Sequence, residues 1–300
     1  MSRQQQEELD ATLRQGAFDP NGEVAELRAG FEALMRSIPI PSDVTKTNMT
    51  VGGVDAVEVT VDGVDSANVI LYFHGGVYVI GSADSSVPLV ADLARRTGTK
   101  VVSVNYRLAP ENPYPAAVED ARAVYEGLLS QGVDPNNIAL SGESAGGGLT
   151  TALLLGLRDA GRPMPSSAFV MSPWVDLTLS GNTILDRQKV DPILTGEALR
   201  MRVGDYVADA NASDPFISPI FADLRGLPPI LIQVGSHEIL LSDALRLAER
   251  AANGDVEVTL DVVPGVPHVF QAYAAVLDEG NAALDRAATF LNTHFAVVQH

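Results

Sequence analysis

The sequence contains no cysteine, has only 20 lysine and arginine residues against 38 aspartate and glutamate residues, and has no long apolar run. The lack of cysteine excludes disulfide bonds and thiol catalysis, and it fits a reducing cytosol. The formal net charge of −18 argues against nucleic acid as a partner and against anionic membrane surfaces, because both attract basic patches. No apolar stretch approaches the roughly 20 residues that span a bilayer. Residues 1–8 lack the apolar segment of a signal peptide. These absences predict a cytoplasmic protein without stable membrane association.

The distribution of apolar residues predicts an α/β fold. Composition is 46% hydrophobic and 19% charged, which is enough to bury a large core. Two helices are expected across residues 2–38, with a break at 18–22. Apolar and polar residues alternate at 54–61, and this alternation predicts an antiparallel strand at the edge of a sheet. Short apolar runs then alternate with helical runs, as in a parallel sheet. These runs lie at 69–73, 100–104, 138–141, 168–172, 230–234 and 256–262.

One motif has the context of a nucleophile elbow. The apolar run 138–140 leads into Gly142-Glu143-Ser144-Ala145-Gly146, and a helical run follows at 149–157. The two glycines remove side chains that would clash in such a sharp turn. The turn would present the Ser144 hydroxyl at the positive end of the following helix. The alternative is a tight turn with an incidental serine, and the flanking strand and helix favour the catalytic interpretation.

The apolar run 69–73 ends in His74-Gly75-Gly76-Val77, which is a candidate oxyanion loop. A serine that attacks a carbonyl carbon needs backbone N–H groups aimed at the oxygen that becomes negative. We expect these donors in Gly75, Gly76 and Val77, together with the N–H of Ala145 after the nucleophile. The alternative is an ordinary turn after a strand. Because a β-branched residue resists positive φ, we expect Val77 to adopt tolerated backbone angles while keeping its N–H available.

The candidate base is His268, in the loop that follows the strand at 256–262. An elbow serine is followed along the chain first by an acid and then by a histidine. Loops at the carboxyl ends of parallel strands are where α/β folds place their chemistry. His74 precedes Ser144 along the chain, and His237 comes too early to leave room for an acid between it and Ser144. His294 and His300 lie near the C-terminus.

The candidate acid is Glu238, the first carboxylate after the strand at 230–234. Asp243 follows about one and a half helical turns later and faces elsewhere, so it is the fallback. His237 and Glu238 resemble the start of a zinc-binding motif, but Leu241 stands where the second histidine is required. We therefore expect no metal and no cofactor.

Together with the segment 105–117, these motifs resemble the hormone-sensitive-lipase-like family of α/β-hydrolase carboxylesterases, roughly from Val69 to Phe295. The resemblance implies one α/β-hydrolase domain over residues 1–300, with an eight-stranded, mostly parallel sheet flanked by helices. It implies a helical cap formed by residues 1–45 and about 179–212. The implied activity is hydrolysis of carboxylic esters with short to medium acyl chains through Ser144, Glu238 and His268. Two positions depart from the family pattern, in which the acid is usually aspartate and a third glycine stands at the position of Val77.

The sequence leaves the substrate, the oligomeric state and the pocket lining open. The implied partner is a small-molecule ester, and the alternatives are a hydrolase of lactones or amides and a catalytically impaired ligand-binding protein. A homodimer through an edge strand or the C-terminal helix is possible by analogy with the fold. We expect Arg107 and Glu111 to pair within the segment 105–117. Apolar residues of the insertion are candidates for the pocket lining, namely Ile193, Leu194, Leu199, Met201 and Val203.

Overall fold

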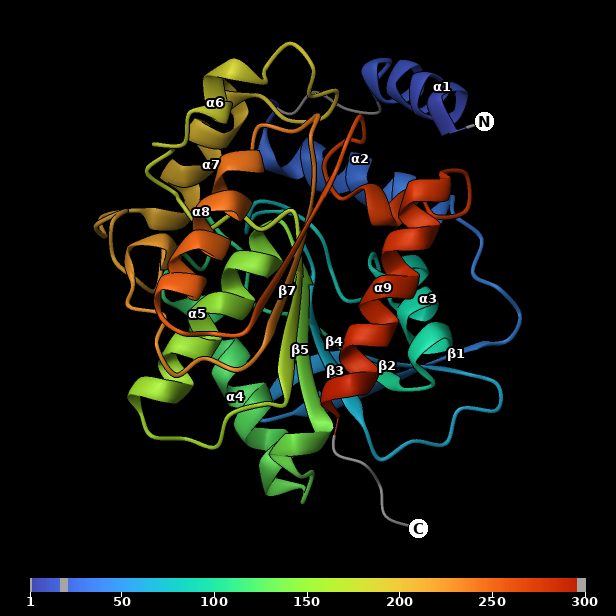
Figure 1. Cartoon of the computed structure of the whole chain (residues 1–300), viewed down its shortest axis with the longest axis vertical. Helices are drawn as coiled ribbons and strands as arrows, with labels where there is room; N and C mark the ends of the chain where they lie inside the picture. The colour runs from blue at the N-terminus through green and yellow to red at the C-terminus, as the bar shows by residue number, and fades with distance from the viewer. Residues whose placement is uncertain (1, 17–20, 296–300) are drawn as a thin grey trace.

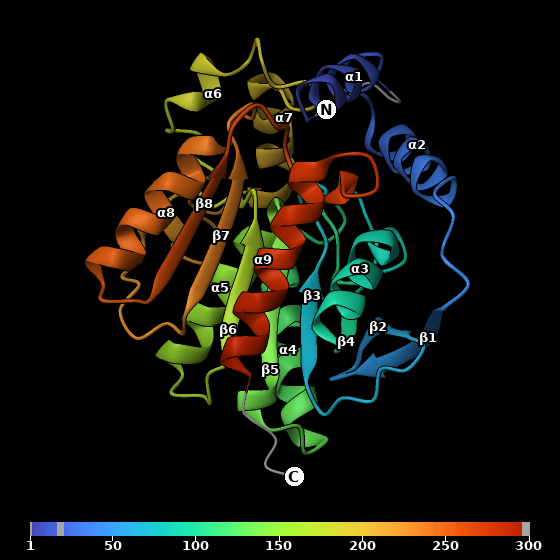
Figure 2. The same ribbon diagram turned by 45° about the vertical axis from the view of Figure 1, so that its right-hand side comes forward.

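A computed structural model describes residues 2–16 and 21–295. Its centre is an eight-stranded sheet in the order β1-β2-β4-β3-β5-β6-β7-β8 (Figures 1 and 2). The first two strands pair antiparallel, and β4 to β8 run parallel with β3. The strands are β1 Val44–Val51, β2 Val54–Val61, β3 Val69–Phe73, β4 Lys100–Val104, β5 Ile138–Glu143, β6 Ser167–Met171, β7 Ile230–Gly235 and β8 Val258–Val263. The predicted sheet is thus confirmed.

The prediction that 54–61 forms an edge strand is wrong. This strand is β2, and it lies between β1 and β4. The outer strand β1 was not predicted, because most of its side chains are exposed and its sequence shows no clear apolar alternation. Val57 and Val59 are fully buried because they pack with helix α3 (Val87–Thr97) on one face of the sheet.

Helices cover both faces of the sheet (Figures 1 and 2). α3 and α9 pack on one face, and α4, α5 and α8 pack on the other. Every residue of β3 is buried, as expected for a parallel strand covered on both sides. These helices are α3 Val87–Thr97, α4 Ala116–Ser130, α5 Ala145–Asp159, α8 Leu241–Asn253 and α9 Asp278–His294, and short 3₁₀ turns lie at Pro135–Asn137, Pro219–Phe221 and Phe270–Tyr273.

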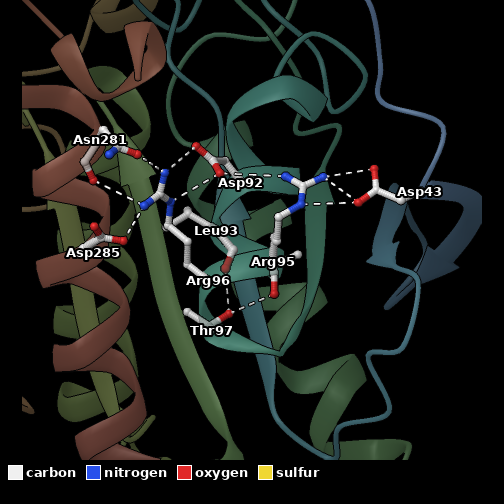
Figure 3. A network of polar contacts seen from close by, with 9 residues as sticks. Asp43, Asp92, Leu93, Arg95, Arg96, Thr97, Asn281 and Asp285 are labelled. Atoms are coloured by element: carbon white, nitrogen blue, oxygen red, sulfur yellow. Dashed lines mark hydrogen bonds and ion pairs between the residues drawn. The ribbon is translucent and has the colours of Figure 1, made fainter. Parts of the chain in front are cut away.

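A polar network joins α3 to α9 and to the chain before β1 (Figure 3). Arg96 of α3 donates to Asn281 Oδ1 at 2.6 Å and also bonds to Asp285, both on α9. Arg95 bonds to Asp43 at 2.9 Å. Exposed ion pairs of this kind contribute about 0–1 kcal/mol each, so they supplement the apolar packing between the two helices.

The remaining helices gather at the carboxyl ends of the parallel strands (Figures 1 and 2). They are α1 Ser2–Arg14, α2 Val24–Arg36, α6 Thr183–Asp186 and α7 Gly196–Val207. The two predicted N-terminal helices are confirmed, although residues 18–20 of the predicted break lie outside the described residues. The short α6 was not predicted. Within the described ranges, no helix has the length and apolar character that a membrane crossing requires.

Candidate active site

The strand-to-helix turn at Ser144 is sharp and strained. β5 ends at Glu143 and α5 begins at Ala145, and Ser144 between them has φ 54° and ψ −120°. Such angles are costly for a residue with a side chain. The neighbouring glycines are needed because a Cβ on Gly146 would lie 1.9 Å from the carbonyl oxygen of Phe73, and one on Gly142 would lie 2.4 Å from that of Gly146. The local sequence therefore specifies the elbow conformation.

His268 and Glu238 form a buried pair. The Nδ1 atom of His268 lies 2.7 Å from Oε2 of Glu238. The Glu238 carboxylate is fully buried, and its Oε1 accepts hydrogen bonds from the Ser172 hydroxyl at 2.8 Å and from the Gly235 N–H at 2.7 Å. The Ser172 hydroxyl in turn accepts from the N–H of Val269 at 3.0 Å. The carboxylate is thus held rigidly, and it fixes the orientation of the imidazole.

The fallback acid, Asp243, has a different environment. Its Oδ2 accepts from the N–H groups of Val175 and Asp176, both at 3.0 Å. Burial and the nearby Asp176 carboxylate raise the pKa of Asp243 to about 8. Asp243 therefore anchors the chain after β6, and Glu238 is the carboxylate next to the histidine.

Three carboxylates raise the proton affinity of His268. Burial is the largest single effect and lowers the pKa of the imidazole, but Glu238, and after it Asp191 and Glu143, together outweigh burial, so the pKa of His268 lies above its ordinary value of 6.5. With Nδ1–H donating to Glu238, Nε2 is left as an acceptor. Ser144 and His268 line the same cavity, although no hydrogen bond joins their side chains in the described part of the chain. In enzymes without bound substrate this bond is often long and tightens on binding.

The candidate oxyanion loop is a tight turn with left-handed residues. Gly76 O accepts from the N–H groups of Val79 at 2.8 Å and Ile80 at 2.9 Å. Val77 and Tyr78 have φ values of 50° and 63°. Positive φ at both central residues is the pattern of a type I′ turn. The expectation of ordinary angles for Val77 is therefore wrong.

Packing holds this turn in place. The ring of Tyr78 is buried and stacks on Tyr206 of α7 with centroids 3.8 Å apart. Arg28 of α2 donates to the carbonyl oxygen of Val79 at 2.8 Å. The surrounding structure thus compensates for the strain at Val77.

One predicted oxyanion donor is already occupied. The Gly75 N–H donates to Glu143 Oε1 at 2.6 Å, so Gly75 is not free to bind an oxyanion. The N–H groups of Gly76, Val77 and Ala145 have no hydrogen-bond acceptor within residues 2–16 and 21–295. The contact between Glu143 and Gly75 was not predicted from the sequence. Glu143 also accepts from the Tyr72 hydroxyl, and burial raises the pKa of Glu143 to about 7.

A cavity of about 310 Å³ opens over Ser144 and His268. Its walls are mostly apolar side chains from α2 and from the segment 193–199. Of the predicted lining residues, Ile193, Leu194 and Leu199 line it. Met201 and Val203 do not, and the side chain of Met201 points largely to solvent. Arg202 also lines the cavity, which was not predicted from the sequence.

The predicted pairing of Arg107 with Glu111 is wrong. Arg107 pairs with Asp120 at 2.8 Å, at the start of α4. Glu111 instead pairs with Arg28 at 2.7 Å. Since Arg28 lies on α2, this ion pair and the bond to Val79 fasten an N-terminal helix to the oxyanion loop, a long-range contact that the sequence does not reveal.

Comparison with known proteins agrees with this geometry. A family model for the alpha/beta hydrolase fold matches residues 70–272. An acetyl-hydrolase of Streptomyces hygroscopicus is 40% identical over 278 residues, covering 91% of each chain. An esterase of Acinetobacter venetianus is 39% identical, covering 94% of this chain and 93% of the relative. The crystal structure of an esterase from the bacterial hormone-sensitive lipase family superposes with a TM-score of 0.94 at 38% identity, covering 98% of this chain and 99% of that one. The chain therefore belongs to the hormone-sensitive-lipase-like family of the α/β-hydrolase fold and is a carboxylic ester hydrolase.

Proposed function

We propose that the chain hydrolyses esters by a serine mechanism with an acyl-enzyme intermediate. Ser144 attacks the ester carbonyl while Nε2 of His268 takes the hydroxyl proton. Glu238 holds the imidazole tautomer and stabilises its charged form. The alcohol leaves with that proton, and a water activated by His268 then releases the acid. The observation that carries this proposal is the buried 2.7 Å contact of His268 with Glu238 beside the cavity that Ser144 lines.

The oxyanion of the tetrahedral intermediate would bind to the N–H groups of Gly76, Val77 and Ala145. Their lack of other acceptors supports this assignment, since donors held ready in a dry site need no rearrangement during the reaction. Gly75 acts indirectly, by fixing the loop through Glu143.

The substrate class is esters with short to medium acyl chains, bound under a cap. A cap made of residues 1–45 and about 179–212 is supported by the side chains of α2 and α7 that line the cavity. Residues 1 and 17–20 of this cap lie outside the described residues. A cavity of about 310 Å³ suits a small ester, and one relative is named an acetyl-hydrolase. The same chemistry would act on lactones or amides. A homodimer through an edge strand or the C-terminal helix stays a prediction.

The test is the hydrolysis of p-nitrophenyl esters from acetate to decanoate. We expect turnover with an optimum at a short or medium chain, and loss of turnover in Ser144→Ala. Ser213→Ala, which changes an exposed serine, is the matched control and should behave like the parent. If Ser144→Ala hydrolysed these esters as fast as the parent, the serine mechanism would be refuted.

A further inference from the structure

Arg202 is a buried cation in the wall of a mostly apolar cavity. Its side chain is only 6% exposed, yet it lines the same cavity as Ser144 and His268. It lies on α7 three and four residues after Leu199 and Ala198, which therefore share its helix face and line the cavity beside it. A charged side chain at this position is not needed to fill space, because an apolar residue would do so at lower cost in desolvation.

The guanidinium group is poorly satisfied. Nε and Nη1 of Arg202 are buried and have no hydrogen-bond partner among the described residues. Nη1 lies 3.2 Å from Oδ2 of Asp205 in an ion pair. Since neither atom is hydrogen-bonded within the part of the chain that the structure describes, this contact is one of charge without hydrogen-bond geometry. An arginine has five N–H donors in a planar fork, and buried donors without acceptors are rare in native proteins. The guanidinium group therefore lacks hydrogen-bond acceptors, and it belongs to a residue of the cavity wall.

We propose that Arg202 binds a carboxylate on the substrate, so that the preferred esters carry an acidic group away from the scissile bond. This inference rests on the proposed function. A carboxylate matches the guanidinium fork with two parallel hydrogen bonds, and its charge offsets that of the buried cation. A neutral hydrocarbon chain in the same place would leave the donors unpaired. Sites with buried donors discriminate strongly against substrates that lack the acceptor.

The test compares esters that differ only in the acidic group. Monomethyl succinate, glutarate and adipate are paired with methyl butyrate, valerate and hexanoate, in which a methyl group replaces the distal carboxylate. Acetate esters of 4-hydroxybutyrate and of 1-butanol test an acid on the alcohol side. Alkali uptake at constant pH gives kcat/KM for each ester. The measured quantity is the ratio of kcat/KM for the acidic ester to that for its neutral partner.

We expect this ratio in Arg202→Met to fall about tenfold or more for at least one pair, because a hydrogen-bonded charge contact is lost. Arg202→Lys should retain part of the preference, because it keeps the charge without the planar fork. Arg200→Met removes an exposed arginine from the same helix and should leave the ratio unchanged.

Two results would overturn the inference. One is a ratio that is the same in Arg202→Met, Arg202→Lys and the parent for every pair. The other is an equal loss of both members of each pair, which would mean that Arg202 only supports the fold. Absence of turnover with all esters, neutral and acidic, in the parent would instead refute the proposed function, so the two failures are distinguishable.

Discussion

Glu143 and Gly75 are joined by a 2.6 Å hydrogen bond from the backbone N–H of Gly75 to the Glu143 carboxylate. The bond connects the residue before the candidate nucleophile with the loop that carries the candidate oxyanion donors. The two parts of the site come from different strands, β5 and β3, so their relative position depends on contacts of this kind. We therefore predict that Glu143 acts as a positioning residue, through the candidate oxyanion loop.

The first prediction follows from this contact. Glu143→Ala removes the acceptor, and we expect kcat to fall about tenfold to a hundredfold while KM changes little, because the loop donors move relative to Ser144. Glu143→Gln keeps an oxygen acceptor for the Gly75 N–H and should stay close to the parent. Steady-state kinetics on one p-nitrophenyl ester would show this. Equal activity of the alanine variant and the parent would contradict the positioning role.

The second prediction concerns the proton on Glu143. Burial raises the pKa of Glu143 from 4.5 to about 7, so between these values the folded chain holds a proton that the unfolded chain has lost. This group therefore reduces the free energy of unfolding as pH rises from about 4.5 to 7. Gln does not titrate, so Glu143→Gln should gain stability relative to the parent across that window, by up to about 3 kcal/mol. Urea unfolding at several pH values measures this, and parallel pH profiles for the two proteins would argue against it.

The third prediction concerns the acid. In Glu238→Gln, we expect kcat to fall about 10³–10⁴-fold, because the imidazole loses the partner that fixes its tautomer. The pH midpoint of the acidic limb of kcat/KM should also move down. In the parent we expect this midpoint above 6.5, because Glu238 contributes most of the effect that raises the pKa of His268 against burial, and Glu238→Gln removes that contribution. The pH–rate profile checks both effects.

Asp243→Asn is the matched control for Glu238→Gln. Asp243 is a buried carboxylate at the start of the next helix, and its hydrogen bonds go to the backbone of Val175 and Asp176. We expect the control to change kcat less than about threefold and to leave the midpoint in place. A larger loss in Asp243→Asn than in Glu238→Gln would reverse the assignment of the acid.

Motifs with a local physical cause were predictable from the sequence. The elbow at Ser144 follows from glycines whose Cβ atoms would collide with backbone, and the parallel strands follow from apolar runs. Glu238 was chosen over Asp243 because it is the first carboxylate after its strand and because helix geometry turns Asp243 away, and the surroundings of the two carboxylates agree with that choice.

Two of the missed features depend on contacts between distant segments. Val77 keeps positive φ because Tyr78 stacks on Tyr206, more than a hundred residues away in the sequence. Glu111 pairs with Arg28 of another helix rather than with its neighbour Arg107. Local patterns carry no information about partners this far apart in the sequence. Strand β1 is a different case, because it pairs with the neighbouring strand β2 and was missed since most of its side chains are exposed.

The fourth prediction tests the N–H of Val77. Val77→Pro removes that donor and cannot adopt φ 50°, so we expect kcat to fall about a hundredfold to a thousandfold, as when an oxyanion donor is lost. Val77→Gly keeps the N–H and accepts positive φ without strain, so it should be at least as active as the parent. Kinetics and thermal unfolding are measured together, so that misfolding of the proline variant is recognised. Near-parental turnover in folded Val77→Pro would remove Val77 from the oxyanion hole.

The fifth prediction compares two glycines of the same helix, α5. A Cβ on Gly146 would lie 1.9 Å from the carbonyl oxygen of Phe73 in β3, and neither backbone segment can move without breaking the elbow. We expect Gly146→Ala to lose about 3 kcal/mol or more of its free energy of unfolding. A Cβ on Gly156 would meet Phe216 at an ordinary 3.7 Å, so Gly156→Ala should gain about 0.5–1 kcal/mol from helix propensity.

Urea unfolding of the two alanine variants and the parent measures the change in free energy of unfolding for each substitution. Because both variants replace glycine by alanine in the same helix, a difference between them reports the steric constraint at Gly146 rather than helix propensity. If the elbow were not specified by steric exclusion at Gly146, both variants would gain stability together. A loss confined to Gly146→Ala, with activity lost in parallel, would show that the chain holds Ser144 in its strained conformation through the close approach of α5 to β3.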